Sequence, residues 1–155
     1  GRISSSNRCL FVQVKGKTKQ SGTSKINDGE IGALQAIIAE LRLAGHYHRH
    51  VIVICYYEAQ CRLVKTRIDQ KYEVHTVDSA QGREADISIV LTTRTKATTA
   101  DFFTSHLRAN VAMSRQKEAI IVLGTAALRE TDPWSALLDD KYFTTVDFES
   151  IRATL

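Results

Sequence analysis

The residues of this sequence best suited to bind a ligand are gathered in one turn in the middle of the chain. Residues 77–94, VDSAQGREADISIVLTTR, place a polar, glycine-centred turn directly before an apolar run. The polar residues around Gly82 are Asp78, Ser79, Gln81, Arg83, Glu84 and Asp86. Gly82 permits a positive φ or a close backbone approach, which a turn can use with or without a ligand. Two interpretations therefore stay open here: the turn only reverses the chain, or it holds a ligand.

The elements that position this turn alternate between strands and helices. Apolar runs indicate strands over residues 9–15, 51–55, 73–77, 86–93 and 119–124. Helical spacing indicates helices over 27–45, 58–68 and 107–117, and residues 125–155 are expected to pack back over the sheet as short helices. This alternation predicts an α/β fold, a parallel sheet with helices on both faces. Ligands of such sheets bind at the carboxyl ends of the strands, where both the turn and the segment beginning at Tyr56 are expected.

The first helix carries its own boundary signals. Asn27 suits the N-cap position, with Glu30 three residues later in a variant of the capping box. Gly45 suits the end of this helix. We expect residues 1–8 to be a flexible segment and residues 9–155 to form a single domain, because that length is enough to bury a core.

The composition limits the possible partners. The chain of 155 residues has a net charge of +4 and a pI near 9.1, which favours a polyanionic partner without requiring one. Basic residues cluster in KGKTKQSGTSK (15–25), for which a solvated, mobile loop is the simpler interpretation. No stretch approaches the roughly 18 unbroken apolar residues of a membrane span, so we expect no membrane partner.

Three cysteines and a group of histidines give weaker signals. Cys9, Cys55 and Cys61 form no CxxC pair, which favours a reducing compartment and hence an intracellular protein, cytoplasmic or nuclear. HYHRH (46–50) could present three imidazoles on one side, but a closed zinc site needs four ligands and only Cys55 is an obvious addition. We therefore expect a polar loop that enters a strand, and no metal site.

Three separated segments together resemble a known family. VIVICYYEAQ (51–60), VDSAQGREADISIVLTTR (77–94) and LRANVAMSRQKEAIIVLG (107–124) resemble motifs IV, V and VI of superfamily 1 helicases, in the branch of the nonsense-mediated-decay helicase and senataxin. SGTSKINDGE (21–30) is similar to the S-x-x-N-x-x-E segment of that family. The resemblance covers roughly residues 9–138. It implies a RecA-like second lobe, a P-loop NTPase-type fold that lacks its own phosphate loop; no GxxxxGK[ST] or GxGxxG pattern occurs in the chain.

The resemblance implies that one side of the turn contacts ATP. Arg115 in NVAMSR matches the arginine finger of the family, a permanently charged group that stabilises the γ-phosphate during phosphoryl transfer. Glu84 resembles the residue that accepts a hydrogen bond from the ribose, and Gly82 and Arg83 are counted with it among the ATP-binding residues. ATP and Mg²⁺ are the implied cofactors, with Mg²⁺ held mainly by an upstream RecA-like lobe of the same protein.

The resemblance also implies contacts to a single-stranded nucleic acid, with RNA favoured over DNA. Ser79 and Gln81 can donate hydrogen bonds to phosphates or riboses. Tyr57 matches the tyrosine after the motif IV strand, where it would stack on a base or pack on the edge of the sheet. Arg94 is a further candidate for a phosphate contact, and the protein is expected to be monomeric.

The sequence departs from the family pattern at a few matched positions. Cys55 and Tyr56 replace Thr and Pro, Cys61 replaces Arg, and Gln116 replaces Ala. The leading hypothesis is the C-terminal motor lobe of an ATP-dependent RNA or DNA helicase, inactive without its upstream lobe. The alternative is a motor-inactive helicase-like domain that serves as a protein- or RNA-binding scaffold. A free-standing doubly wound domain with a small-molecule site is a third, weaker option.

Overall fold

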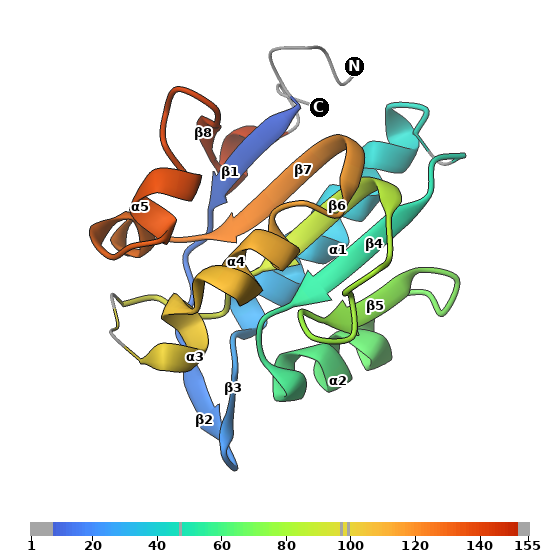
Figure 1. Cartoon of the computed structure of the whole chain (residues 1–155). Helices are drawn as coiled ribbons and strands as arrows, with labels where there is room; N and C mark the ends of the chain where they lie inside the picture. The colour runs from blue at the N-terminus through green and yellow to red at the C-terminus, as the bar shows by residue number, and fades with distance from the viewer. Residues whose placement is uncertain (1–7, 47, 97, 99, 152–155) are drawn as a thin grey trace.

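The chain folds into a six-stranded sheet with helices on both faces (Figure 1). The computed structural model describes residues 8–46, 48–96, 98 and 100–151. The strands follow the order β5-β4-β6-β7-β1-β8 and every pairing in this sheet is parallel, which confirms the predicted α/β fold. Their bounds are β1 (Cys9–Gln13), β4 (Val51–Cys55), β5 (Glu73–Thr76), β6 (Ala85–Leu91), β7 (Gln116–Gly124) and β8 (Thr144–Asp147).

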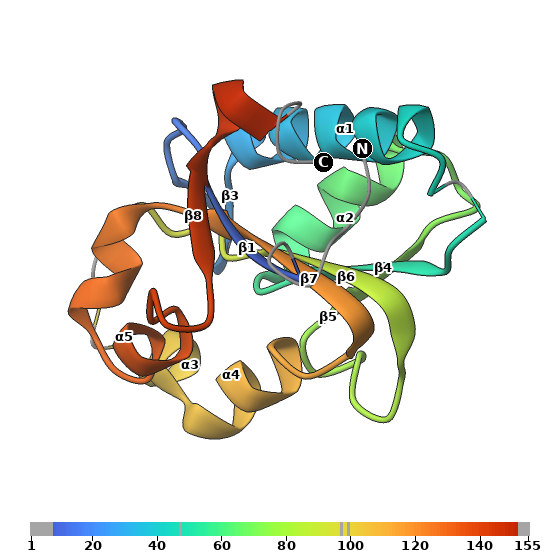
Figure 2. The same ribbon diagram turned by 90° about the horizontal axis from the view of Figure 1, so that it is seen from above.

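The helices form one layer on each face of the sheet. α1 (Asp28–Leu43) and α2 (Glu58–Arg67) cover one face, and α3 (Asp101–Thr104), α4 (His106–Ala112) and α5 (Trp134–Leu137) lie on the other (Figure 2). The short helical turns η2 (Ala126–Glu130) and η3 (Phe148–Ser150) flank α5 and β8 in sequence. All five residues of β4, VIVIC, are buried because the strand is central and covered on both sides. No helix among the described residues has the length and apolar character to cross a bilayer.

The layer of short helices is held by an aromatic core. Trp134 is fully buried and its ring stacks on that of Phe103, with 5.1 Å between the centroids. The indole Nε1 of Trp134 donates to the carbonyl oxygen of Phe103 at 3.0 Å, so its polar atom is satisfied inside the core. The ring of Tyr56 packs against both, at 4.9 Å from Phe103 and 5.4 Å from Trp134. This cluster fixes α3, and through it α4, above the sheet.

The boundary signals of α1 are confirmed only in part. The Asn27 side chain accepts a hydrogen bond from the backbone N of Glu30 (3.2 Å), and Gly45 follows the helix with a φ of +90°. The Glu30 carboxylate does not return to Asn27 as a capping box requires. It accepts instead from the backbone N of Thr93, and the backbone N of Asn27 donates to Oε1 of Gln60 (2.9 Å). A tertiary contact has replaced the local one.

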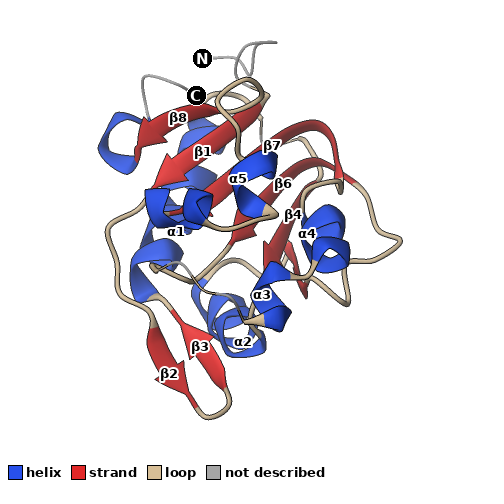
Figure 3. Ribbon diagram, turned by 60° about the vertical axis from the view of Figure 1, so that its left-hand side comes forward, coloured by secondary structure: helices blue, strands red, loops and turns tan. Residues whose placement is uncertain are grey.

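The basic segment 15–25, for which a mobile loop was expected, contains a β-hairpin. β2 (Lys19–Ser21) pairs antiparallel with β3 (Ser24–Ile26) through a two-residue turn in which Gly22 has a φ of +61°. Figure 3 shows this hairpin projecting beyond the sheet near α2. The backbone N of Ala59 at the start of α2 donates to Oγ of Ser24 (3.1 Å), which ties the hairpin to the fold.

Two other elements differ from the sequence-based expectation. The helix predicted over 107–117 ends at Ala112, because Gln116 pairs with Ala85 and begins β7. In the tail, residues Thr144–Asp147 form the edge strand β8 alongside β1, in addition to short helices. A short, polar edge strand has no apolar run that could reveal it.

The histidine segment does not gather with Cys55. His50 directly precedes β4 and Cys55 ends it, so the two lie at opposite ends of the strand. Nδ1 of the buried His46 accepts from Nε of Arg49 at 3.2 Å. The expected flexible segment 1–8 lies outside the described residues except for Arg8, whose carbonyl oxygen accepts from the backbone N of Ile120 (2.8 Å).

Candidate nucleotide and nucleic-acid site

The turn between β5 and β6 runs from the carboxyl ends of the strands to their amino ends. These two sides of the sheet are called its carboxyl edge and its amino edge. Both strands run parallel to β4, so the chain must return from the carboxyl edge to the amino edge within residues 77–84. Val77 and Ala80 are buried in the core layer that also contains Ala109 and Ala112 of α4, and they pin the turn to the sheet. The side chains of Ser79 and of residues 81–84 remain exposed.

The first and last residues of the turn therefore lie at opposite edges of the sheet. Ser79 lies near the carboxyl end of β5, where its hydroxyl exchanges hydrogen bonds with Thr76. Glu84 directly precedes β6 and therefore lies at the amino edge. The expectation that the whole turn sits at the carboxyl ends of the strands is thus wrong for Gly82, Arg83 and Glu84, because the turn is used to cross the sheet.

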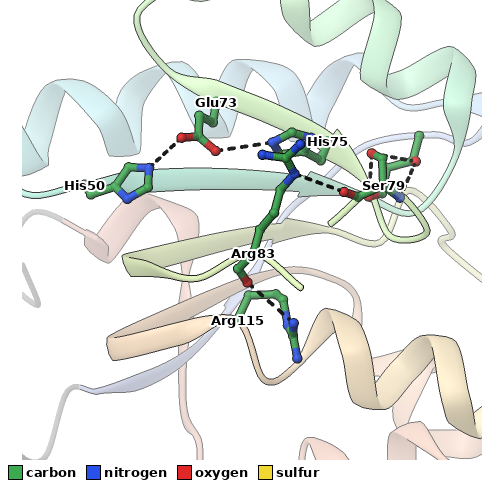
Figure 4. A network of polar contacts seen from close by, with 7 residues as sticks. His50, Glu73, His75, Ser79, Arg83 and Arg115 are labelled. Atoms are coloured by element: carbon green, nitrogen blue, oxygen red, sulfur yellow. Dashed lines mark hydrogen bonds and ion pairs between the residues drawn. The ribbon is translucent and has the colours of Figure 1, made fainter. Parts of the chain in front are cut away.

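Arg115 meets the turn at the amino edge. The backbone N of Ala85 donates to the carbonyl oxygen of Arg115 at 3.0 Å, which places Glu84 and Arg115 at the starts of the neighbouring strands β6 and β7. Nη2 of Arg115 donates to Oγ of Ser114 (2.9 Å), and Nη1 makes a long contact of 3.5 Å with the carbonyl oxygen of Arg83. The Arg83 side chain itself runs back along the turn, and its Nε donates to the carbonyl oxygen of Ser79 at 3.3 Å (Figure 4).

One polar atom of Arg115 has no partner. Its Nε is buried and makes no hydrogen bond within the described chain. A buried donor without an acceptor costs about 1–3 kcal/mol, and a guanidinium cannot remove this cost by losing its proton.

Gly82 and Glu84 complete the amino end of the turn. Gly82 has a φ of +81°, so the turn needs glycine for its backbone conformation, and a Cβ there would meet no atom within 4 Å. Glu84 is exposed and takes part in none of the ion pairs formed between described residues. Glu84 therefore forms no ion pair with Arg83 or with a lysine among the described residues.

Aromatic and basic side chains gather at the carboxyl edge. Tyr57 occupies the N-cap position of α2 and is 8% exposed, and the ring of Phe102 lies 5.3 Å from its own. Burial raises the pKa of Tyr57, and an interaction with the Arg94 side chain opposes that rise. Phe102 is 38% exposed, so it offers more free ring surface than Tyr57 does.

Arg108 is a residue of this edge that the sequence did not single out. Its Nε donates to Oδ1 of Asp78 at 3.1 Å, and its guanidinium lies 4.4 Å from the centroid of the Phe102 ring. These contacts join α4 to the start of the turn and to α3. A basic residue two positions before NVAMSR was the available signal, but spacing alone does not show that it faces Asp78.

A buried polar network supports the backbone just before Arg94. The Glu30 carboxylate accepts from the backbone N of Thr93 at 2.9 and 3.0 Å, and Nδ2 of Asn27 donates to the carbonyl oxygen of Thr93 at 3.1 Å. The Gln60 amide bonds both the backbone N and the carbonyl oxygen of Asn27, each at 2.9 Å. Thr93 has a φ of +71°, which is strained for a β-branched residue and persists where contacts overdetermine it.

Burial makes Glu30 unusual among the acids of the chain. Desolvation raises the pKa of its carboxyl group to about 8, against the opposing effect of the hydrogen bonds from the Thr93 backbone and the Thr92 side chain. The residues of the S-x-x-N-x-x-E segment and the Gln of motif IV therefore meet in one buried network. Within the described chain their side chains bond backbone groups.

Comparisons with known proteins show the family and the fold of the chain. A family model described as "AAA domain" matches residues 2–127. The chain is 29% identical over 142 residues to "Probable helicase senataxin" of Homo sapiens, a match that covers 84% of this chain and 5% of that protein. It is 29% identical over 131 residues to "Regulator of nonsense transcripts 1" of Caenorhabditis elegans, covering 77% of this chain and 12% of that protein. It is 34% identical over 107 residues to "DNA polymerase alpha-associated DNA helicase A" of Saccharomyces cerevisiae, covering 65% of this chain and 16% of that protein.

A solved structure shares the fold. The C-terminal domain of a possible DNA helicase from Lactobacillus plantarum superposes with a TM-score of 0.60 at 11% identity, covering 89% of this chain and 84% of that one. The chain spans between 5% and 16% of the length of the three curated relatives, so it corresponds to one part of such proteins. The chain belongs to the AAA-domain family, is similar in sequence to senataxin and regulator of nonsense transcripts 1, and shares the fold of a helicase C-terminal domain.

Proposed function

We propose that the chain is the C-terminal motor lobe of an ATP-dependent helicase, which closes together with an upstream lobe on ATP and on a single strand of nucleic acid. The observation that carries this proposal is the path of the turn 77–84. One pinned segment joins Glu84 and Arg115 at the amino edge to Ser79 at the carboxyl edge. Such a segment can transmit a change at the nucleotide to the strand, because both contacts lie on the same short stretch of backbone.

At the amino edge, the chain would supply charge and orientation to the nucleotide. Arg115 would bring its guanidinium to the γ-phosphate, where the Nη donors of its fork would find acceptor oxygens. Glu84 would accept a hydrogen bond from the ribose, and Gly82 and Arg83 would shape the same side. As the family resemblance implies, Mg²⁺ would be held mainly by the upstream lobe.

At the carboxyl edge, the chain would hold the strand by its backbone and bases. Ser79 and, from the exposed middle of the turn, Gln81 would donate to phosphates or riboses, and Arg94 would contact a phosphate. Tyr57 would contribute to a stacking surface that Phe102 extends, since Phe102 has the more exposed ring. RNA is favoured over DNA, and the protein is proposed to act as a monomer inside the cell, in the cytoplasm or the nucleus.

The departures from the family pattern do not favour the scaffold alternative. Cys55 and Tyr56, which stand where the family has Thr and Pro, are both buried, and Tyr56 packs in the aromatic core. Gln116 turns inward as well, with its Nε2 donating to the carbonyl oxygen of Met113 at 3.2 Å. These substitutions alter the interior of the lobe and leave the exposed residues of the turn in place.

The test is the substitution Arg115→Ala in the full-length protein. We expect ATP turnover to fall on the order of 10³-fold, the effect of removing an arginine finger. The matched control is Arg67→Ala, which removes an exposed arginine at the end of α2 on the other face of the sheet. A near-normal rate in Arg115→Ala would overturn the assignment. A wild-type protein that binds RNA but whose ATP turnover is not stimulated by a strand would favour the scaffold.

A further inference from the structure

A small basic hollow lies between the β2–β3 hairpin and the segment that follows β6. Its volume is about 260 Å³, and it is lined by Thr18, Gln20, Lys25, Arg94, Thr95 and Lys96. Three of these six side chains are cationic, two carry hydroxyls and one is an amide; no carboxylate lines the hollow. This set consists of the groups that bind phosphate oxygens.

The cations of the hollow are not neutralised by acids. None of the ion pairs between described residues engages Lys25, Arg94 or Lys96. Nζ of Lys25 donates to Oε1 of Gln20 at 2.7 Å, a neutral partner, and Arg94 interacts with the Tyr57 hydroxyl. Three cations that line one hollow repel each other, so the site favours an anion that they can share.

The floor of the hollow is fixed by buried contacts. Oγ1 of Thr18 donates to the carbonyl oxygen of Thr93 at 2.7 Å and lies 3.2 Å from Oγ1 of Thr95. The Asn27 side chain bonds the same carbonyl, and the buried Glu30 carboxylate holds the backbone N of Thr93. The strained Thr93 therefore has both backbone polar groups held from the side of the hairpin and α1. This arrangement fixes the direction in which Arg94 and Thr95 leave the sheet.

The hollow lies at the carboxyl edge, where the strand is proposed to bind. Arg94 follows the carboxyl end of β6 and contacts Tyr57, which follows the carboxyl end of β4. The hairpin and α3 project at this same edge (Figure 1). A strand that crosses Tyr57 and Phe102 therefore has this hollow beside its path.

We propose that the hollow binds a backbone phosphate of the single strand, with Lys25, Arg94 and Lys96 supplying the charge. This inference rests on the proposed function, since it names a contact of the same nucleic-acid face. It also gives the β2–β3 hairpin a role, because the hairpin contributes Lys25 to the lining of the hollow.

The experiment measures binding of a fluorescent single-stranded RNA to the full-length protein at several salt concentrations. The variant is Lys25→Ala with Lys96→Ala, and the control is Lys71→Ala, an exposed lysine at the opposite edge of the sheet just before β5. Each lost phosphate contact lowers the slope of log K against log salt by about 0.7, so the double variant is expected to lower it by about 1.4. Raising salt fourfold then weakens the double variant about sevenfold less than it weakens the wild type and the control.

The outcomes separate this proposal from the proposed function. A double variant with the slope of the control refutes the hollow while leaving the motor assignment intact. A wild-type protein with no salt-dependent affinity for a single strand refutes both. A third measurement adds inorganic phosphate to the binding assay. If millimolar phosphate competes with the RNA, and the double variant keeps the same slope of log K against log salt as the control, the hollow takes a free anion instead of a strand.

Discussion

The buried carboxyl group of Glu30 leads to a prediction that separates the effect of hydrogen bonding from that of charge. In Glu30→Ala the backbone N of Thr93 loses the acceptor that it has at 2.9 and 3.0 Å. A buried N–H without a partner costs about 1–3 kcal/mol, and the lost methylene adds about 0.8 kcal/mol. We expect the free energy of unfolding of Glu30→Ala to fall by about 2–4 kcal/mol. Glu30→Gln keeps an acceptor oxygen of similar shape and is expected to stay within about 1.5 kcal/mol of the wild type at pH 6.

The pH dependence of stability gives the same prediction a second readout. The pKa of the Glu30 carboxyl group is about 8 in the folded chain, raised mainly by desolvation from the usual value of 4.5. Between these two values the folded state binds more protons than the unfolded state, so stability falls as the pH rises and levels off above about 8. The slope contributed by one such group is at most about 1.4 kcal/mol per pH unit, and Glu30→Gln lacks it.

The assay is urea unfolding of the wild type and both variants from pH 5 to pH 8.5. The difference in free energy between the wild type and Glu30→Gln isolates the Glu30 contribution, because the other titrating groups are common to both. The reasoning is refuted if this difference does not change with pH. It is also refuted if Glu30→Gln is as unstable as Glu30→Ala at pH 6, since the acceptor would then not be what stabilises Thr93.

Two further predictions concern the turn and the aromatic core. Gly82→Ala is expected to lower the free energy of unfolding by about 1–2 kcal/mol, because Gly82 has a φ of +81°. The added Cβ would meet no atom within 4 Å, so the backbone conformation is the only source of this loss. Unchanged stability in urea unfolding would contradict this prediction. Trp134→Ala is expected to cost about 3–5 kcal/mol, since a fully buried ring is lost, whereas Trp134→Phe should keep most of the packing and lose the donor to Phe103. Equal losses in thermal unfolding of the two Trp134 variants would show that packing against Phe103 is not the main contribution.

Much of the fold could be predicted from patterns that local physics enforces. The central strands β4 and β6 and the second part of β7 (residues 119–124) are apolar runs because both faces of the sheet are covered, and they lie where the sequence indicated. The start and end of α1 followed from Asn27 and Gly45, whose side chain and backbone preferences act within one helical turn. Elements without such patterns could not be predicted. β8 is short and polar, and the β2–β3 hairpin lies in a lysine-rich segment that has no apolar alternation.

For the candidate site, the sequence by itself determined which residue types were available around Gly82 and in NVAMSR, and the comparisons confirm the family that those motifs indicate. The tertiary structure alone decided how they meet. Because β5 and β6 are both parallel to β4, the turn must cross the sheet, and this crossing brings Glu84 beside Arg115 while it leaves Ser79 at the other edge. The tertiary structure also decided that Glu30 bonds the backbone N of Thr93 instead of closing a capping box, since a buried N–H must find an acceptor wherever the fold provides one.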